Sequence, residues 1–191
     1  MTKKEQHTID MCSGSLPGKI LLFALPLAAS RLLQLLFNAA DIVVVGKFVG
    51  KEALAAVGSN TALINLLISI FVGLSIGTNV TLARDIGAKQ MDAVRRGVHT
   101  SVCLALFSGV VLMVFGMCVA PQLLRWMDSP DDVIDLASRY LRIYFLGMPA
   151  TMTYDFGGAV LSAQGDTRRP LYALFLAGVA NVAMNLLFVI G

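Results

Sequence analysis

Long apolar runs separated by short polar connections dominate the chain. Five of these runs reach about 20 residues, the length that a helix needs to cross the hydrocarbon core of a bilayer. They lie at residues 20–45, 55–82, 98–120, 140–163 and 171–191. The runs are too long, and alternate too weakly, for the strands of a membrane barrel. The pattern predicts an all-α polytopic membrane protein, with a polar tail at residues 1–18 and a transmembrane bundle of five helices at residues 19–191.

The composition agrees with the hydropathy pattern. The chain has 191 residues, of which 57% are hydrophobic and 14% charged, and its mean hydropathy is +0.75. Soluble domains usually carry about 25% charged residues. The sequence has no Walker loop, no metal-ligand spacing and no nucleophile–base signature. We therefore expect no enzyme activity, no bound metal and no nucleic-acid partner.

A polar stripe interrupts the first apolar run. Arg31, Gln34, Asn38 and Asp41 are spaced by three, four and three residues. Positions with this spacing lie on one face of a helix. Charged residues are costly in hydrocarbon, so such a face must meet other helices or a water-filled cavity. The stripe predicts a path through the membrane.

The depth of two stripe residues leaves other interpretations open. Asp41 follows Leu22 by 19 residues, roughly 29 Å along a helix. In a core about 30 Å thick, an ordinary hydrated aspartate at the outer interface is the alternative. Arg31 lies nearer the middle, where we expect a structural role, by pairing with a carboxylate or by reaching for the interface.

Other spans carry polar or helix-bending residues. Asp155 follows Tyr154 in the fourth span, and the fifth carries Asn181 and Asn185 on one face. Asn65 lies in the second span, as does a GxxxG spacing at residues 73 and 77 that permits close helix packing. Pro26 and Pro149 each remove a backbone donor. They are predicted either to act as hinges or to be simply tolerated in membrane helices.

Basic residues are distributed unequally between the two ends of the predicted spans. One side holds nine: Lys3, Lys4, Lys19, Arg84, Lys89, Arg95, Arg96, Arg168 and Arg169. The other side holds five: Lys47, Lys51, Arg125, Arg139 and Arg142. The positive-inside rule therefore predicts a cytoplasmic N-terminus.

Four segments resemble one family of transporters. They are ADIVVVGKFVGKEALAAVG from Ala40, GTNVTLARDIGAKQ from Gly77, QGDTRRP from Gln164 and NVAMNLLFV from Asn181. Their sequence and order resemble the N-terminal part of MATE (multidrug and toxic compound extrusion) transporters. The resemblance implies twelve helices in two six-helix lobes in the plasma membrane. This chain would supply five helices, most of one lobe, and lack the sixth helix and the second lobe. We therefore expect a fragment or a truncated reading frame.

The resemblance also implies a function and a site. MATE transporters export organic cations and other amphiphiles in exchange for H⁺ or Na⁺, with no cofactor beyond the ion gradient. Asp41 matches the family's ion-coupling aspartate and is a possible Na⁺ ligand. Asn181 matches an asparagine that the family's site uses in the fifth helix. Asn185 stands where many members have a second aspartate. Since an amide does not titrate, Asp155 is predicted to supply the second carboxylate.

Further expectations follow from this resemblance. Gln34, Asn38, Asn65 and Tyr154 are expected to line the substrate cavity. One alternative function is a lipid-linked oligosaccharide flippase of the same superfamily, in which more cationic residues line the cavity. Another is a non-transporting membrane subunit or an inactive lobe.

Overall fold

The computed structural model describes residues 16–48, 51–126 and 131–190, which form six α-helices. The helices are α1 Leu16–Phe48, α2 Lys51–Gly87, α3 Met91–Trp126, α4 Asp131–Leu146, α5 Met148–Ala163 and α6 Arg168–Ile190. The predicted all-α membrane fold is confirmed. Most helices extend beyond their apolar spans, and α1 already begins at Leu16, inside the predicted tail. Pro17 permits this early start, because a proline is well tolerated in the first turn of a helix.

Among the described residues, four helices are long and apolar enough to cross a membrane. The qualifying segments are Pro17–Val44, Ile64–Gly87, Met91–Val119 and Arg168–Leu187. The predicted fourth span instead falls on α4 and α5, two consecutive helices of 16 residues each. The chain breaks between them at Gly147, and Pro149 lies in the first turn of α5. Because proline cannot donate within a helix and crowds the preceding turn, the break falls beside Pro149, the residue at which the sequence predicts a possible hinge.

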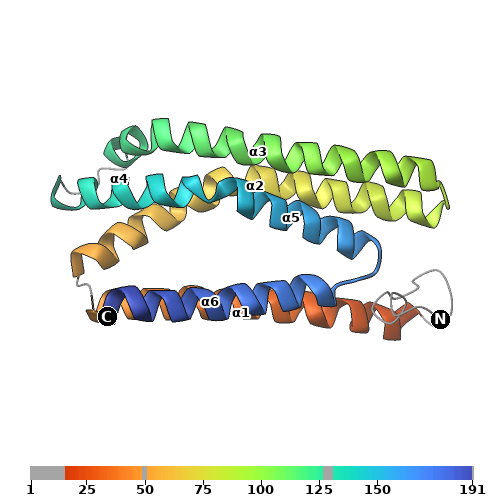
Figure 1. Cartoon of the computed structure of the whole chain (residues 1–191), viewed down its shortest axis with the longest axis horizontal. Coiled ribbons are helices and arrows are strands. Elements are labelled where there is room, and N and C mark those ends of the chain that lie inside the picture. Colours follow the sequence, from red (N-terminus) through yellow and green to blue (C-terminus); the bar gives the residue numbers. More distant parts are fainter. Residues whose placement is uncertain (1–15, 49–50, 127–130, 191) are drawn as a thin grey trace.

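The helices form two groups, a bundle and a pair. Helices α2, α3, α4 and α5 pack together as a bundle, while α1 and α6 run side by side and parallel below it (Figure 1). The buried apolar core lies entirely in the bundle: Ile64, Ala105, Leu112, Leu124, Ala137, Leu141, Phe145, Met148, Met152 and Phe156. Among the described side chains of α1, none is buried. The bundle is therefore the packed part of the structure.

Two glycines of α3 bring the bundle helices into close contact. A Cβ atom added at Gly109 would lie 2.5 Å from the Cα atom of Pro149, and one at Gly116 would overlap the ring of Phe145. By contrast, a Cβ added at Gly73 or Gly77 meets nothing within 4 Å. Within the described residues, the GxxxG spacing of α2 is thus not used for close packing, and that expectation was wrong. The close approaches occur where no sequence motif marked them.

Helices α1 and α6 pack against each other, and few interactions join them to the bundle. Phe37 of α1 lies against Gly178 of α6, where an added Cβ would overlap the ring. The turn between α5 and α6 contains Gly165 at a φ of 83°, which glycine adopts readily. Asp166 then caps α6, since its Oδ1 atom accepts hydrogen bonds from the amides of Arg168 (3.2 Å) and Arg169 (3.1 Å).

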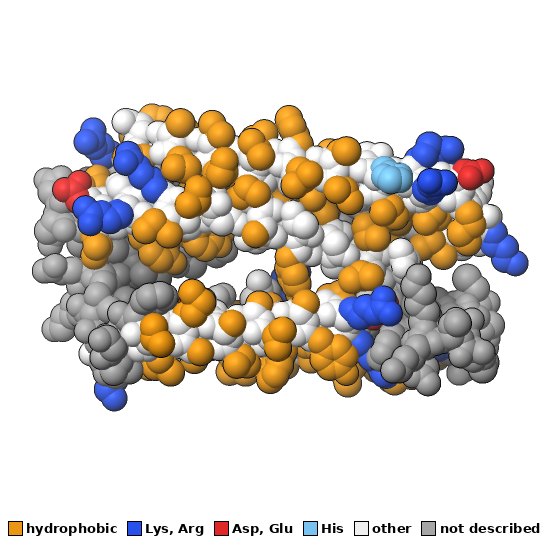
Figure 2. Space-filling view, viewed as in Figure 1, with side chains coloured by type: hydrophobic (Ala, Val, Ile, Leu, Met, Phe, Trp, Pro, Cys, Tyr) orange, Lys and Arg blue, Asp and Glu red, His pale blue; other side chains and the backbone are white. Residues whose placement is uncertain are grey.

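The surface matches a membrane environment. Hydrophobic side chains cover the middle of the helices, while Lys and Arg gather toward the two ends of the molecule (Figure 2). The same view shows a hollow between the bundle and the pair. Large apolar residues such as Leu25, Ile70 and Leu176 are more than two-thirds exposed. In a bilayer, lipid tails would cover such residues, so their exposure fits a polytopic membrane protein.

Candidate functional site

The first part of the site joins α1 to α6 through a carboxylate and two amides. Asn185 donates a hydrogen bond from Nδ2 to Oδ1 of Asp41, although 144 positions separate them in the sequence. The same Nδ2 lies 3.4 Å from Oδ1 of Asn181, one turn earlier on α6. Asp41 and Asn185 are both partly buried. The structure thus brings together three predicted ion-coupling residues in one cluster, which we call the Asp41 cluster.

Two tyrosines of α4 interact with the carboxylates of the site. Tyr140 interacts electrostatically with Asp41, and Tyr144 interacts electrostatically with Asp155. Their rings stack with centroids 6.2 Å apart. Both tyrosines are thereby linked to the candidate ion-coupling carboxylates, an interaction that their sequence positions do not indicate.

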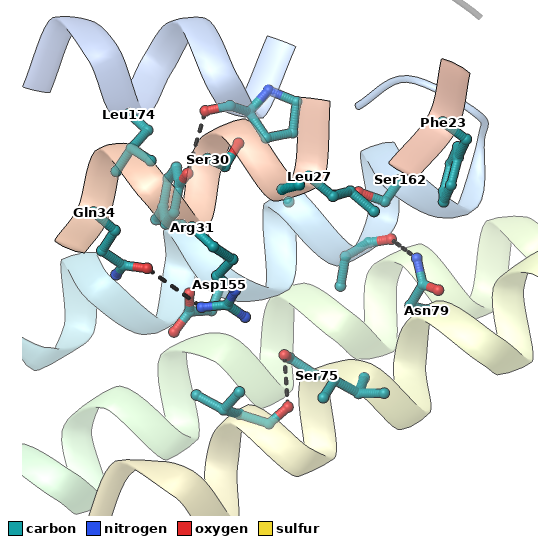
Figure 3. Close-up of a pocket in the computed structure, with 17 residues that line it drawn as sticks. Phe23, Leu27, Ser30, Arg31, Gln34, Ser75, Asn79, Asp155, Ser162 and Leu174 are labelled. Carbon is teal, nitrogen blue, oxygen red and sulfur yellow. Dashed lines mark hydrogen bonds between the residues drawn. The ribbon is translucent and has the colours of Figure 1, made fainter. Parts of the chain in front are cut away.

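A cavity of about 410 Å³ lies between the pair and the bundle. Its walls come from α1, α2, α5 and α6 (Figure 3). Its polar lining consists of Ser30, Arg31, Gln34, Ser75, Asn79, Tyr154, Asp155 and Ser162. The remaining lining is apolar or small, including Phe23, Leu27, Val72 and Leu174. An apolar cavity with a few convergent polar groups is typical of small-molecule sites.

Hydrogen bonds fix several residues of this cavity. Nδ2 of Asn79 donates to the carbonyl of Ala159 at 2.8 Å, which links α2 to α5. The Tyr154 hydroxyl donates to the carbonyl of Pro170 at 3.2 Å, which links α5 to α6. Arg31 donates from its guanidinium to Oε1 of Gln34 at 3.3 Å. Hydrogen bonds therefore link α2 to α5 and α5 to α6, while the bond of Arg31 lies within α1.

The predicted site residues fall into two levels. Gln34, Tyr154 and Asp155 line the cavity, whereas Asp41 belongs to the other cluster. Arg31 and Asp41 are ten residues apart on α1, about 15 Å along the helix axis. The joint action of Asp41 and Asp155 stays a prediction. Tyr140 and Tyr144 are the residues that interact electrostatically with these two carboxylates.

Four other predicted residues lie outside the lining of this cavity. Asn38 and Asn65 are exposed, and neither is among the lining residues. Pro26 lies inside the continuous helix α1, and its carbonyl accepts a hydrogen bond from the Ser30 hydroxyl at 2.9 Å. Pro149 lies beside the break at Gly147. The cavity role of the two asparagines and the hinge role of the two prolines stay predictions.

Sequence reasoning missed two features of the cavity. Arg31 was assigned a structural role, yet its side chain extends into the cavity opposite Asp155 (Figure 3). Asn79 received no role from its sequence position, yet it forms the link to α5. Ser75 and Asn79 are four residues apart, which was the available signal that they share one helix face.

This arrangement defines a class: a helical membrane protein with a polar cavity between a pair of helices and a bundle. Comparison with known proteins then identifies the family. The MatE family model matches residues 26–187. The chain is 33% identical to the probable multidrug resistance protein YoeA of Bacillus subtilis, over 89% of this chain and 37% of that relative. It is 27% identical to a probable multidrug resistance protein NorM of Thermotoga maritima, over 91% of this chain and 37% of the relative.

Solved structures show the same relationship. The chain superposes on an outward-facing multidrug resistance MATE transporter with a TM-score of 0.87 and 27% identity, covering 95% of this chain and 41% of that one. For an inward-facing MATE transporter the TM-score is 0.74, covering 85% and 38%. The chain belongs to the MATE family. It spans about 40% of the length of these relatives, as expected for most of one lobe.

Proposed function

We propose that this chain is the ion-coupling lobe of a secondary multidrug antiporter. It would export cationic or amphiphilic xenobiotics in exchange for H⁺ or Na⁺ across the plasma membrane, with a second lobe from the same polypeptide or from another copy. The observation that carries the proposal is the hydrogen bond from Asn185 to Asp41, which joins α1 to α6 within the MATE fold. It places a titratable carboxylate at the contact between two helices that contribute little to the packed core.

Exchange follows from the chemistry of the Asp41 cluster. A carboxylate takes up a proton, or coordinates Na⁺ through its oxygens, and the amide oxygens of Asn181 and Asn185 offer further ligands of the same kind. Either ion competes with Asn185 for Asp41. Binding therefore alters the contact between α1 and α6, and the bend of α1 near Pro26 would respond. A ligand shifts such an equilibrium only by its differential affinity for the two states.

A cationic substrate links the cavity to the same exchange. Asp155 attracts a cation into the cavity, and the stacked Tyr140–Tyr144 pair interacts electrostatically with Asp41 through Tyr140 and with Asp155 through Tyr144. We propose that substrate at Asp155 and an ion at Asp41 are bound in alternation, so that one gradient drives the other. The greater number of Lys and Arg residues near the ends of α2, the start of α3 and the start of α6 supports a cytoplasmic location for that side.

Efflux of a fluorescent organic cation tests this proposal. Cells would express the chain alone and joined to a second lobe, each as wild type, Asp41→Asn and Asp155→Asn, at external pH 6 and pH 8. We expect efflux only from the two-lobe protein, and its loss in Asp41→Asn. Proton coupling predicts faster efflux at pH 6, because the inward proton gradient is larger, whereas sodium coupling predicts dependence on external Na⁺. Unchanged efflux in Asp41→Asn would refute the coupling role.

The flippase alternative makes a different prediction for the same cavity. It requires several cationic residues to hold a phosphorylated headgroup. Arg31 is the one Lys or Arg among the described residues that line the cavity. This favours a multidrug antiporter over the flippase.

A further inference from the structure

Arg31 is a charged residue in the middle of a membrane-spanning helix, and the ion-coupling proposal gives it no role. It lies within the span Pro17–Val44. A guanidinium there is costly unless it meets a partner or a water-filled cavity. It has five N–H donors. In the part of the chain that the structure describes, it makes one side-chain hydrogen bond, to Gln34, and no ion pair. Most of its donors are thus available to a molecule in the cavity.

Asp155 faces Arg31 from the opposite wall. Arg31 belongs to α1 and Asp155 to α5, and both extend into the same space (Figure 3). The two groups interact electrostatically, although they are too far apart to form an ion pair. Gln34 lies beside Arg31, and Leu27, Val72 and Leu174 supply apolar surface around the charges. The cavity therefore carries one positive pole at Arg31 and one negative pole at Asp155, contributed by different helices.

This charge pattern selects among amphiphilic molecules. A purely cationic molecule gains attraction from Asp155 but meets a like charge at Arg31. A molecule with both a cationic and an acidic group satisfies both poles at once. A carboxylate suits Arg31 in particular, because the planar guanidinium can bind both carboxylate oxygens.

We propose that Arg31 is a specificity-determining residue, and that the cavity prefers amphiphilic zwitterions whose acidic group binds Arg31 and whose cationic group binds Asp155. The inference rests on the proposed transport function and narrows its substrate class. It assigns to Arg31 a role that differs from internal packing, since packing alone would not distinguish ligands by their charge.

A matched pair of dyes tests the preference. Rhodamine 110 carries a cationic ring system and a free carboxylate, and rhodamine 123 is its methyl ester, which keeps the cation and loses the acid. Binding of each dye to the purified 191-residue chain in lipid nanodiscs is followed by fluorescence polarisation. We expect the wild type to bind rhodamine 110 roughly tenfold more tightly, as for a partly desolvated charge pair.

Three variants assign the preference to Arg31. Arg31→Gln is expected to reverse it, weakening rhodamine 110 and strengthening rhodamine 123. Arg31→Lys keeps the charge without the planar fork, so a reduced preference for rhodamine 110 should remain. Arg142→Gln removes an exposed arginine of α4 that does not line the cavity, and it should change neither affinity. Far-UV circular dichroism checks that each variant is folded.

Several outcomes would overturn the proposal. These are equal affinity of the wild type for both dyes, an equal loss of both dyes in Arg31→Gln, or no binding of either dye. Equilibrium binding needs no ion gradient, so these outcomes are separate from ion coupling.

Discussion

The bundle and the pair use their residues in opposite ways. Helices α2 to α5 bury apolar side chains such as Phe145 and Phe156 against one another. Helices α1 and α6 contribute nothing to that core, and instead meet through Phe37 on Gly178 and through Asn185 on Asp41. Regions with few buried contacts open at lower free energy than packed cores. The bundle is therefore the more tightly packed part, and under the proposed function the pair is the element that would move when an ion binds.

Substitution of Gly109 should have the largest effect on stability, because it disrupts the packing of the bundle. In Gly109→Ala the added Cβ atom meets the backbone of Pro149 at 2.5 Å, and backbone cannot move aside as a side chain can. We expect a loss of about 1–3 kcal/mol in the free energy of unfolding. Thermal unfolding by far-UV circular dichroism in detergent measures it. Gly73→Ala, which meets nothing within 4 Å, is the control; equal melting temperatures would contradict close α3–α5 packing.

Removal of the α6 cap should have the next largest effect on stability, because it weakens the turn that joins the bundle to the pair. Asp166→Ala leaves the amides of Arg168 and Arg169 without their acceptor. Loss of a cap costs about 0.5–2 kcal/mol. Asp166→Asn keeps the acceptor and loses the ion pair with Arg169, in which Oδ2 lies 3.0 Å from Nε. The alanine variant should therefore melt lower than the asparagine variant, and the reverse order would exclude the capping role.

A smaller effect on stability is expected within the pair, at the contact between Phe37 and Gly178. Gly178→Ala places a methyl group against the ring of Phe37, which can partly shift, so we expect a loss of about 1 kcal/mol. In the Phe37→Ala background the same change should have almost no effect, because the clashing ring is gone. A double-mutant cycle of thermal stability measures this coupling. Additive effects would show that α1 and α6 do not meet here.

Substitution of Asn79, within the bundle, should give the smallest loss of stability. Asn79→Ala loses the hydrogen bond to the Ala159 carbonyl. Interhelical hydrogen bonds in membranes average about 0.6 kcal/mol. Thr81→Ala serves as the control, because its hydroxyl bonds only within α2, to the Gly77 carbonyl at 2.9 Å. A cost for Asn79→Ala no larger than that for Thr81→Ala would mean that the link from α2 to α5 contributes nothing.

Much of the fold could be predicted from the sequence, because the lipid bilayer restricts such apolar segments to helices. Apolar runs of bilayer length dictate helices, and Pro149 marked the break in the fourth span within two residues of Gly147. The exact break was invisible, since proline is often tolerated inside membrane helices, as Pro26 is in α1. The packing glycines were also missed, because Gly109, Gly116 and Gly178 form no spacing motif, and what they contact depends on tertiary structure.

The site was predictable residue by residue but not in its grouping. The spacing of Asp41 along α1 and of Asn181 and Asn185 along α6 follows from helix geometry. Their meeting does not, because it depends on α6 lying beside α1, which no local pattern encodes. For the same reason Arg31 could not be matched with Asp155, which reaches the cavity from α5.

The most direct test of the central claim exchanges the two groups that join α1 to α6. Efflux of an organic cation by the two-lobe protein is compared for wild type, Asp41→Asn and the double variant Asp41→Asn/Asn185→Asp. We expect efflux by the single variant to fall to the background of cells without the transporter. We expect the double variant to regain ion-dependent efflux, since it restores one carboxylate and one amide at the same contact. Full efflux by Asp41→Asn would contradict the account.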